Sequence, residues 1–456
     1  MASQRPIRFA LLGAGTVGAG VLELVAQNAA YLATRIGAPL EVAHVVVKDR
    51  AKARALRVEA AKITTEIDRV LSDPTVDLVV EAIGGEEPAG TYIARALAAG
   101  KSVVTANKAL LAVRAPELLR IAGEHHADLA FEASVGGAIP IIRTLRDHLV
   151  ADWVRGLRGI VNGTCNYILT RMREEGIAFA DVLASAQGLG YAEAEPSLDV
   201  DGHDAAHKLC VLALLAFGAI VRPDEVPTEG IRAIEPIDHR FAARFGYAIK
   251  HLAVGRETSA SAGAPSDGAR GGLDLRVHPA LVPARAPLAS VDGVLNAIAI
   301  DAQGAGAQVL VGRGAGSLPT AVSVVADLVD AARSKRAGVA GLLTQGLEIS
   351  RRPLAPPRTQ EAIWYLRARV ADRPGVLAQI AGALGQHDVS IEQMVQEGGG
   401  GRRASDHAAG EGTEPETRVI VMLTHRASER DVRLALSVID AMGFVEGHTL
   451  AMRVEE

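Results

Sequence analysis

The strongest constraint on the fold comes from a glycine-rich turn, GAGTVG, at residues 13–18. It follows an apolar run at Ile7–Leu12 and precedes a segment with the apolar spacing of a helix. Glycines at the first, third and last positions permit a tight turn, let a phosphate reach backbone N–H groups, and let the helix pack on the strand. A strand before the turn and a helix after it predict a dinucleotide-binding unit rather than an ordinary strand-to-helix turn.

Strand and helix patterns alternate over the first third of the chain. Strands are predicted at 41–47, 78–83, 102–105 and 129–132. Helices are predicted from the glycine-rich turn to about residue 35, at 88–99 and at 115–125. This alternation predicts an α/β fold with a parallel, doubly wound sheet. We expect a Rossmann-type NAD(P)-binding domain over residues 1–138, with a return helix within 313–335.

The pattern changes after Gly136-Gly137. Strands are predicted at 153–161, 249–254, 273–278, 296–300 and 307–312, with a helix at 139–149. Residues 139–312 therefore suggest an α+β domain with its sheet covered on one side, to which the family resemblance given below assigns substrate binding and dimerisation. Residues 336–361 suggest a linker. Residues 362–456 suggest a separate ferredoxin-like module of βαββα order. Segments 258–272 and 398–416 have the composition of surface insertions.

Composition excludes several classes of protein. A net charge of −5 over 456 residues argues against a nucleic-acid partner. Two cysteines give no disulfide framework. The N-terminus lacks the features of a signal peptide, and the longest apolar stretch, Leu209–Val221, is too short to span a bilayer. We expect a cytoplasmic protein with no membrane partner.

The end of the second strand carries the residues that choose the cofactor. An acidic residue there binds the ribose of NAD, whereas basic residues accommodate the 2′-phosphate of NADP. The chain has Lys48 and Arg50 on either side of Asp49. We expect NADP with NAD tolerated, and a solvated basic strand end is the ordinary alternative.

The stretch from Gly190 to Lys208 gathers charged side chains, namely Glu193, Glu195, Asp199, Asp201, Asp204 and Lys208. Asp204 and Lys208 are four residues apart, so on a helix they share one face, with Asp201 as the expected N-cap. Carboxylates bind ammonium groups, and a lysine exchanges a proton with a hydroxyl. A free lysine titrates near about 10.4, so a lysine base needs burial or a second cation, which Lys108 is placed to supply. A surface ion pair is the ordinary alternative.

With these motifs in place, the chain resembles homoserine dehydrogenases of the bacterial type with a C-terminal ACT domain. The resemblance rests on GAGTVG at 13–18, EAIGG at 81–85, TANKALLA at 105–112, FEASVGGAIPII at 131–142, GIVNGTCNYIL at 159–169, GYAEAEPSLDVDGHDAAHKL at 190–209, RGAGSLPTA at 313–321 and the ACT-like segment 370–396. It implies NAD(P)-dependent interconversion of L-homoserine and L-aspartate 4-semialdehyde, in threonine, methionine and isoleucine biosynthesis.

The resemblance also implies roles for individual residues. Lys208 would transfer the proton, Lys108 would be the second catalytic lysine, and Glu193, Asp204 and Asp199 would bind the substrate. The cofactor would contact Gly13, Ala14, Gly15, Thr16, Val17, Gly18, Lys48, Arg50, Lys108, Gly314 and Gly316. A monovalent cation such as sodium would lie at Glu132, Val135, Gly137 and Ile139, mostly on backbone carbonyls. L-threonine would bind the ACT domain of a homo-oligomer, a dimer or tetramer.

Two other functions compete with this one. Cys165 could be the nucleophile of an aldehyde dehydrogenase, which requires a low-pKa thiolate and a nearby base. Alternatively, the chain could be a non-catalytic sensor in which the first domain detects redox state and the last detects an amino acid.

Overall fold

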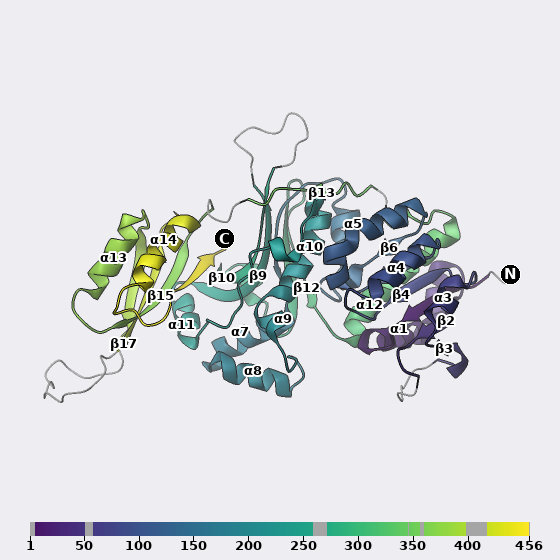
Figure 1. The fold of residues 1–456 in the computed structure, drawn as a ribbon, viewed down its shortest axis with the longest axis horizontal. Coiled ribbons are helices and arrows are strands. Elements are labelled where there is room, and N and C mark those ends of the chain that lie inside the picture. Colours follow the sequence, from purple (N-terminus) through teal and green to yellow (C-terminus); the bar gives the residue numbers. More distant parts are fainter. Residues whose placement is uncertain are drawn as a thin grey trace.

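The computed structural model describes residues 5–50, 58–258, 271–344, 346–355, 360–397 and 417–455. Three parts lie in a row along the molecule, with the N-terminal domain at one end and the C-terminal module at the other (Figure 1). The predicted insertions at 258–272 and 398–416 fall almost wholly outside the described residues. No helix in the described ranges is long and apolar enough to cross a membrane.

The first domain is built on a six-stranded parallel sheet in the order β3-β2-β1-β4-β5-β6. The strands are β1 (Ile7–Leu12), β2 (Leu40–Val46), β3 (Ile63–Thr64), β4 (Leu78–Glu81), β5 (Ser102–Thr105) and β6 (Leu129–Ala130). This confirms the predicted fold class. Strand β3 was not predicted, because two residues are too few to show a periodic pattern.

Both faces of this sheet are covered by helices. Phe9 and Leu11 of β1 belong to one hydrophobic core, and Ala10 and Leu12 belong to another, as the alternation of side chains along a strand requires. The first core includes α1 (Thr16–Gln27) and α12 (Ser317–Ala337), and the second includes α4 (Ala89–Ala98) and α5 (Lys108–Glu124). The sheet is therefore doubly wound, and the predicted return helix packs on it.

Three predicted helix boundaries were wrong. The helix expected from the glycine-rich turn to about residue 35 is two helices, because Asn28 separates α1 from α2 (Ala29–Ile36) and its side chain donates back to the Leu24 carbonyl. The helix expected from 115 begins at Lys108, since the Asn107 side chain caps it. The helix expected at 139–149 is the short α6 (Ile141–Arg143) followed by a π-helical turn at 144–148.

The second sheet has nine strands, in the order β12-β11-β7-β9-β10-β19-β15-β17-β16. The strands are β7 (Val154–Ile160), β9 (Tyr247–Glu257), β10 (Leu273–Pro283), β11 (Leu295–Ala302), β12 (Gly306–Arg313), β15 (Trp364–Ala371), β16 (Ile391–Glu397), β17 (Thr417–Thr424) and β19 (Leu450–Val454). The first five belong to the middle domain and the last four to the C-terminal module.

The C-terminal module is joined to the middle domain through one continuous sheet. Its last strand, β19, was missed, and β19 pairs in parallel with β10, so that one sheet runs through both parts. Helices α7 (Gly163–Glu175) and α11 (Pro236–Arg244) of the middle domain share a core with Tyr365 of β15 and Val421 of β17. The module's own helices, α13 (Val376–Gln386) and α14 (Glu429–Asp440), pack on the other face.

One further helix joins the middle domain to the first. Helix α10 (His203–Phe217) contributes Leu209 and Leu212 to the same core as Leu110 and Leu111 of α5. Its charged N-terminal half is thereby held beside the start of α5, at the carboxyl end of β5. Ligands of open α/β sheets bind at this edge.

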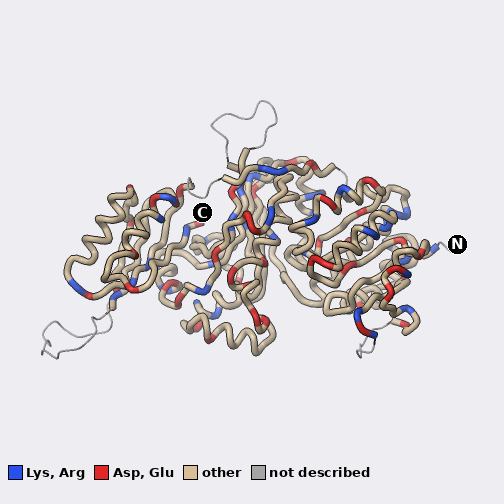
Figure 2. The backbone as a smooth tube through the Cα atoms, in the orientation of Figure 1, with Lys and Arg blue, Asp and Glu red and all other residues tan. Residues whose placement is uncertain are grey.

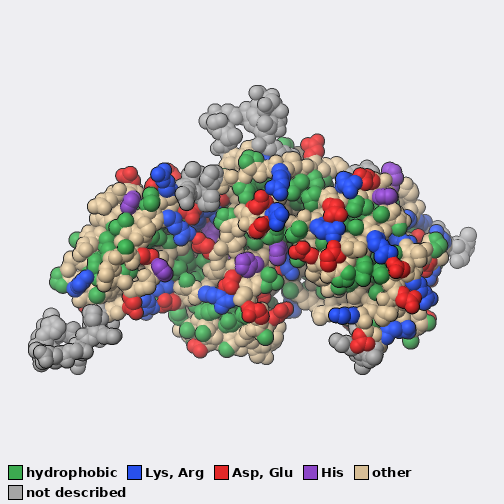
Figure 3. Space-filling model, in the orientation of Figure 1, with side chains coloured by type: hydrophobic (Ala, Val, Ile, Leu, Met, Phe, Trp, Pro, Cys, Tyr) green, Lys and Arg blue, Asp and Glu red, His purple; other side chains and the backbone are tan. Residues whose placement is uncertain are grey.

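Charges of both signs are spread over all three parts of the chain (Figure 2). Acidic, basic and hydrophobic side chains are also mixed on the molecular face drawn in Figure 3. The functional site must therefore be located from specific contacts rather than from an overall charge pattern.

Candidate active site

The glycine-rich turn has the geometry of a phosphate cradle. Gly13 has a φ of +92°, and a Cβ on it would lie 2.6 Å from the Ala82 carbonyl oxygen. A Cβ on Gly18 would lie 2.2 Å from the carbonyl oxygen of Gly13, whereas a Cβ on Gly15 would meet nothing within 4 Å. Gly13 and Gly18 are therefore required by packing, and Gly15 leaves open space at the N-terminus of α1. Open space at a helix N-terminus suits a pyrophosphate, because the first backbone N–H groups of a helix have no partner within it.

The remaining residues of the glycine-rich turn link the phosphate cradle to the core of the first domain. Ala14 and Val17 pack partly buried against the core of the first domain, and Thr16 is the first residue of α1. The Gly13 N–H donates to the Val46 carbonyl at 2.9 Å, so the turn lies beside the end of β2. Lys48 and Arg50 follow that strand and are exposed. This is the position from which a ribose or its phosphate is contacted.

The segment before α12 connects the cradle to the middle domain. The Ser317 hydroxyl donates to the Thr16 carbonyl at 2.8 Å. Gly316 precedes α12 with a φ of +125°, and a Cβ on Gly314 would lie 2.0 Å from Asn296 Nδ2. This close approach holds the loop with Gly314 and Gly316 between the nucleotide turn and the charged end of α10.

Asp204 joins two lysines from different domains. The Lys208 ammonium lies 2.7 Å from Asp204 Oδ2, and the Lys108 ammonium lies 3.3 Å from Oδ1. Lys208 is one turn along α10, whereas Lys108 is the first residue of α5. The predicted contact between Asp204 and Lys208 on one helix face is present, and Lys108 lies where the second cation was predicted.

The carboxyl group of Asp204 is charged in this setting. Burial raises its pKa, but the neighbouring Lys208 and Lys108 cations outweigh burial and hold the pKa well below its usual range. Only 4% of Asp204 is exposed. A buried anion between two cations fixes the position of both ammonium groups.

Three groups that the sequence did not single out complete this cluster. Lys208 Nζ donates to the Val161 carbonyl at 2.6 Å, and Asn296 Nδ2 donates to the same oxygen at 3.0 Å. Asn162 Nδ2 donates to Asp204 Oδ2 at 2.8 Å. Asn162 precedes α7 and its side chain caps that helix. The Asn-Gly-Thr segment is typical of a helix start, but no local pattern indicates which carboxylates Asn162 reaches.

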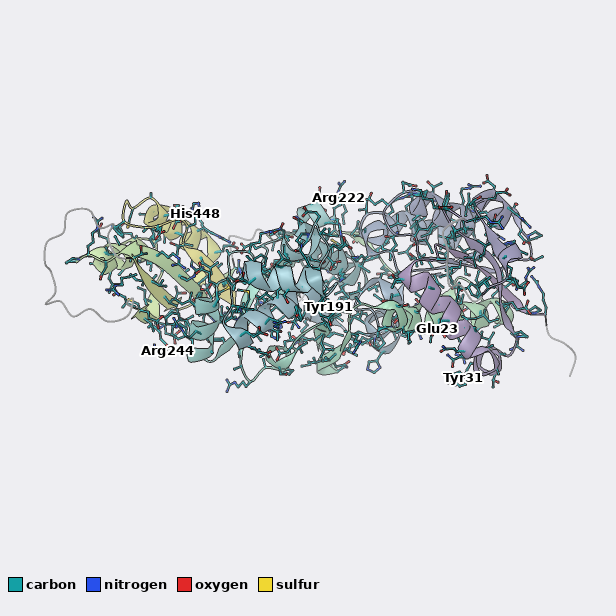
Figure 4. All side chains as sticks on the ribbon, turned by 90° about the horizontal axis from the view of Figure 1, so that it is seen from below. Glu23, Tyr31, Tyr191, Arg222, Arg244 and His448 are labelled. Carbon is teal, nitrogen blue, oxygen red and sulfur yellow. The ribbon has the colours of Figure 1, made fainter. Side chains whose placement is uncertain are left out.

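Asp199 and Glu193 differ in their surroundings. Asp199 Oδ1 accepts from Asn162 Nδ2 at 2.7 Å, and its other oxygen accepts from the Thr164 hydroxyl at 3.2 Å. Within the described part of the chain, the exposed Glu193 carboxylate has no hydrogen bond or ion pair. Tyr191, in the same loop, lies near the middle of the elongated molecule (Figure 4). Asp199 is thus held by the protein, and Glu193 is free to bind a ligand.

The predicted capping role of Asp201 was wrong. Gly202, with a φ of +91°, is the N-cap of α10, and Asp201 ends the short helix α9 (Ser197–Val200). The Asp201 carboxylate pairs with Arg232 at 2.5 Å instead. Because the short helix α9 ends immediately before α10 begins, neither Asp201 nor Gly202 has the extended conformation from which an aspartate would cap α10.

Cys165 lacks the properties of a nucleophile. It is fully buried, and its Sγ donates to the Asp199 carbonyl at 3.2 Å. Burial, together with the nearby Asp199 and Asp204 carboxylates, raises the pKa of its thiol well above the usual value. A thiol with a raised pKa cannot serve the aldehyde dehydrogenase chemistry considered above.

The loop expected to hold a cation is organised by the Glu132 side chain. Its two oxygens accept the backbone N–H groups of Ile142 and Arg143 at 2.8 and 2.9 Å. Burial and the neighbouring Asp327 raise the pKa of Glu132 to about 7, against the opposing effect of these hydrogen bonds. The side chain therefore holds the first turn of α6 against this loop.

Backbone carbonyl oxygens are the cation ligands that this loop offers. The Gly137 carbonyl accepts from the Ser323 hydroxyl at 2.7 Å, and the Ile139 carbonyl accepts from the Ile141 N–H at 2.8 Å. Each keeps a second lone pair, and Val135 is wholly buried in the same loop. Neutral oxygen donors suit a hard monovalent cation. The described residues contain no cluster of three His, Cys, Asp or Glu side chains that would hold a metal.

Comparison with protein families agrees with this geometry. The homoserine dehydrogenase family model matches residues 140–329. The NAD-binding domain model of homoserine dehydrogenase matches residues 13–132, and the ACT domain model matches residues 364–443.

Individual relatives match over the full length. A homoserine dehydrogenase of Pseudomonas aeruginosa is 40% identical over 456 residues, covering 99% of each chain. One of Bacillus subtilis is 38% identical and also covers 99% of each. The crystal structure of a homoserine dehydrogenase from Thiobacillus denitrificans has a TM-score of 0.88 at 40% identity, covering 99% of this chain and 98% of that one. An archaeal homoserine dehydrogenase in complex with NADPH has a TM-score of 0.58 at 26% identity, covering 72% of this chain and 97% of that one.

Proposed function

The chain belongs to the homoserine dehydrogenase family, and from this premise we propose how its residues carry out the reaction. It is an oxidoreductase with a NAD-binding domain, a catalytic domain and an ACT domain. The observation that carries the proposal is the buried Asp204 carboxylate between Lys208 and Lys108, at the edge of the sheet that bears the glycine-rich cradle.

Lys208 transfers the proton. Two of its three N–H donors are used by Asp204 and the Val161 carbonyl, which leaves the third for the substrate oxygen at C4. In aldehyde reduction Lys208 gives a proton to that oxygen, and in alcohol oxidation it takes one back. A nicotinamide cofactor, when bound, would supply the hydride chemistry at C4. Lys108 supplies a second positive charge at the cleft and helps to place the substrate.

The amino-acid end of the substrate has partners of both signs. The exposed Glu193 carboxylate binds the homoserine ammonium group. The first N–H groups of α7, which begins at Gly163 beside Asn162, are donors for the homoserine carboxylate. Asp199, held by Asn162 and Thr164, adds negative charge next to the ammonium position.

NADP is the preferred cofactor in this proposal. Lys48 and Arg50 follow β2 at the position where a 2′-phosphate is bound, next to Gly13, Gly15 and Gly18. A relative of 26% identity was crystallised with NADPH, which supports the same choice here. NAD, with Asp49 on its ribose, is the alternative cofactor.

A monovalent cation such as sodium would lie on the carbonyls of Glu132, Val135, Gly137 and Ile139. Its role would be structural, because this loop joins β6 to α6 and the Gly137 carbonyl already contacts Ser323 of α12. The cation would thereby tie the first domain to the middle domain.

The ACT domain would bind L-threonine and inhibit the enzyme within a homo-oligomer, so that the enzyme serves threonine, methionine and isoleucine biosynthesis. The loop at Asp372–Gly375 precedes α13, and Gly375 caps that helix with a φ of +88°. Backbone N–H groups at such a helix start are suited to an amino-acid carboxylate.

A single assay tests the reaction, the cofactor and the effector. Absorbance at the reduced-nicotinamide band is followed with L-homoserine and either NADP or NAD, with and without L-threonine. We expect homoserine-dependent reduction, faster at low NADP than at low NAD, and slower with threonine. Wild-type protein that binds NADPH but reduces neither cofactor would favour the sensor alternative.

A further inference from the structure

We propose that Asn162 is a positioning residue of this enzyme, whose amide holds the Asp199 and Asp204 carboxylates together and thereby fixes the catalytic lysine. The inference deepens the proposed function of the cleft and rests on it. Asn162 would not contact the substrate, since its side-chain hydrogen-bonding groups are already used inside the protein.

The orientation of the Asn162 amide follows from its partners. Its Oδ1 accepts the Cys165 N–H at 2.8 Å, which fixes the oxygen toward α7. The Nδ2 group therefore points the other way, to Asp199 Oδ1 at 2.7 Å and Asp204 Oδ2 at 2.8 Å. Asn162 is 5% exposed, so little water is present to replace these donors.

The chemistry of the cluster explains why a donor is needed at this point. Two carboxylates that approach one nitrogen so closely repel each other unless a donor lies between them. Asp204 Oδ2 also accepts from Lys208, so a rotation of Asp204 away from Asp199 would move the Lys208 ammonium. The same rotation would withdraw Oδ1 from Lys108.

Asn162 also caps α7, and the test must separate that role from positioning. Serine and aspartate both keep an oxygen that can cap the helix, but neither has an amide donor. Asn162→Ser leaves the carboxylates without a bridge. Asn162→Asp has nearly the same shape and adds a third carboxyl group that faces Asp199 of α9, Asp204 and Lys208 of α10, and, beyond Asp204, Lys108 of α5.

The full-length variants are compared with wild type by thermal melting, NADPH Kd and steady-state kinetics with homoserine. We expect both to bind NADPH as wild type does and to lose about 10- to 100-fold in kcat, the range for a lost hydrogen bond to a charged group. The kcat of Asn162→Asp relative to wild type should recover as pH falls and its new carboxyl gains a proton, while that of Asn162→Ser should not. Ser428→Ala, which removes the cap of α14, is the matched control and should keep kcat.

Two results would overturn the inference. One is an Asn162→Ser enzyme that turns over within about threefold of wild type. The other is a crystal structure of this variant in which Lys108 and Asp204 stay within ion-pair distance, about 4 Å, and Asp199 has not moved. The crystal structure does not depend on turnover. A wild type inactive toward homoserine would therefore contradict the proposed function, and the structure would still decide the role of Asn162.

Discussion

At the scale of single residues, charge balance dominates the cleft. Asp204 is a buried anion that stays ionised because two ammonium groups face it. Removing its partners would leave an uncompensated buried charge, which strongly destabilises a fold, so the two lysines are held beside the carboxylate. The position of the Lys208 ammonium follows from this balance of charges. The choice of cofactor depends on other residues, at the end of β2.

The basic residues after β2 give the first prediction. Replacing Lys48 and Arg50 together with alanine should raise the KM for NADP by about tenfold or more, because a charge-assisted contact to the 2′-phosphate contributes about 1.5 kcal/mol or more. The KM for NAD should change little, since NAD lacks that phosphate. Steady-state kinetics with each cofactor measures both. An unchanged KM for NADP would remove these residues from the cofactor site.

Some site residues were predictable from the sequence and others were not. The spacing of Asp204 and Lys208 predicted their contact, and the place of Lys108 after a strand predicted a second cation nearby; both contacts are present. Asn162 and the Val161 carbonyl were missed because their partners lie on other elements, far away in the sequence. Asp201 was misplaced because glycine, with a positive φ, starts α10.

At the scale of elements, buried histidines couple the middle domain to pH. His251 lies beneath the start of α10, with its Cε1 3.3 Å from where a Cβ on Gly202 would lie. Burial lowers its pKa to about 4, although a hydrogen bond to the Glu229 carbonyl opposes this. Burial, with the nearby Arg173 and Lys250, also lowers the pKa of His239 in α11 to about 4.

These two histidines predict that acid destabilises the fold. In the unfolded chain these two histidines bind protons below about pH 6.5, whereas in the folded chain they do so only below about pH 4. The free energy of unfolding therefore falls as pH falls through this window. Each histidine should contribute roughly 1–2 kcal/mol of loss between pH 6.5 and 5. Urea unfolding of His251→Gln and His239→Gln should show shallower pH dependence, unlike that of the exposed control His425→Gln. Equal slopes in all four proteins would contradict the assignment.

Element boundaries show where sequence patterns fail. Strand β5 was predicted with the ends it has, because its two valines and its threonine are residue types enriched in strands. The break at Asn28 and the early start of α5 were missed, since both depend on an asparagine side chain that bonds to the backbone.

At the scale of the whole molecule, the ACT module is joined to the catalytic domain by a continuous sheet and a buried ion pair. Arg367 of β15 lies 2.7 Å from Asp238 of α11, and Tyr365 donates to the same oxygen at 2.7 Å. The sequence suggested a detachable module because its βαββα pattern looks complete without β19. Truncation at residue 352 would expose β10 and a shared core, so point substitutions test the coupling better.

This junction gives a stability prediction. Arg367→Met leaves the wholly buried Asp238 carboxylate without its cation and should lower the free energy of unfolding by about 3–5 kcal/mol. Adding Asp238→Asn should restore part of the loss. Arg240→Met, at an exposed ion pair with Glu397 across the same junction, should cost about 1 kcal/mol or less. Urea denaturation compares them, and equal losses for Arg367→Met and Arg240→Met would refute the buried junction.

The central claim is that Lys208 transfers the proton in the reaction of L-homoserine. The most direct measurement compares wild type and Lys208→Ala in kcat for homoserine oxidation and in Kd for NADPH. We predict a loss of about 10²- to 10⁴-fold in kcat, the contribution of a positioned acid–base group, with Kd essentially unchanged. A loss of less than about tenfold, in a variant that still binds NADPH, would contradict the account and assign the proton to another group.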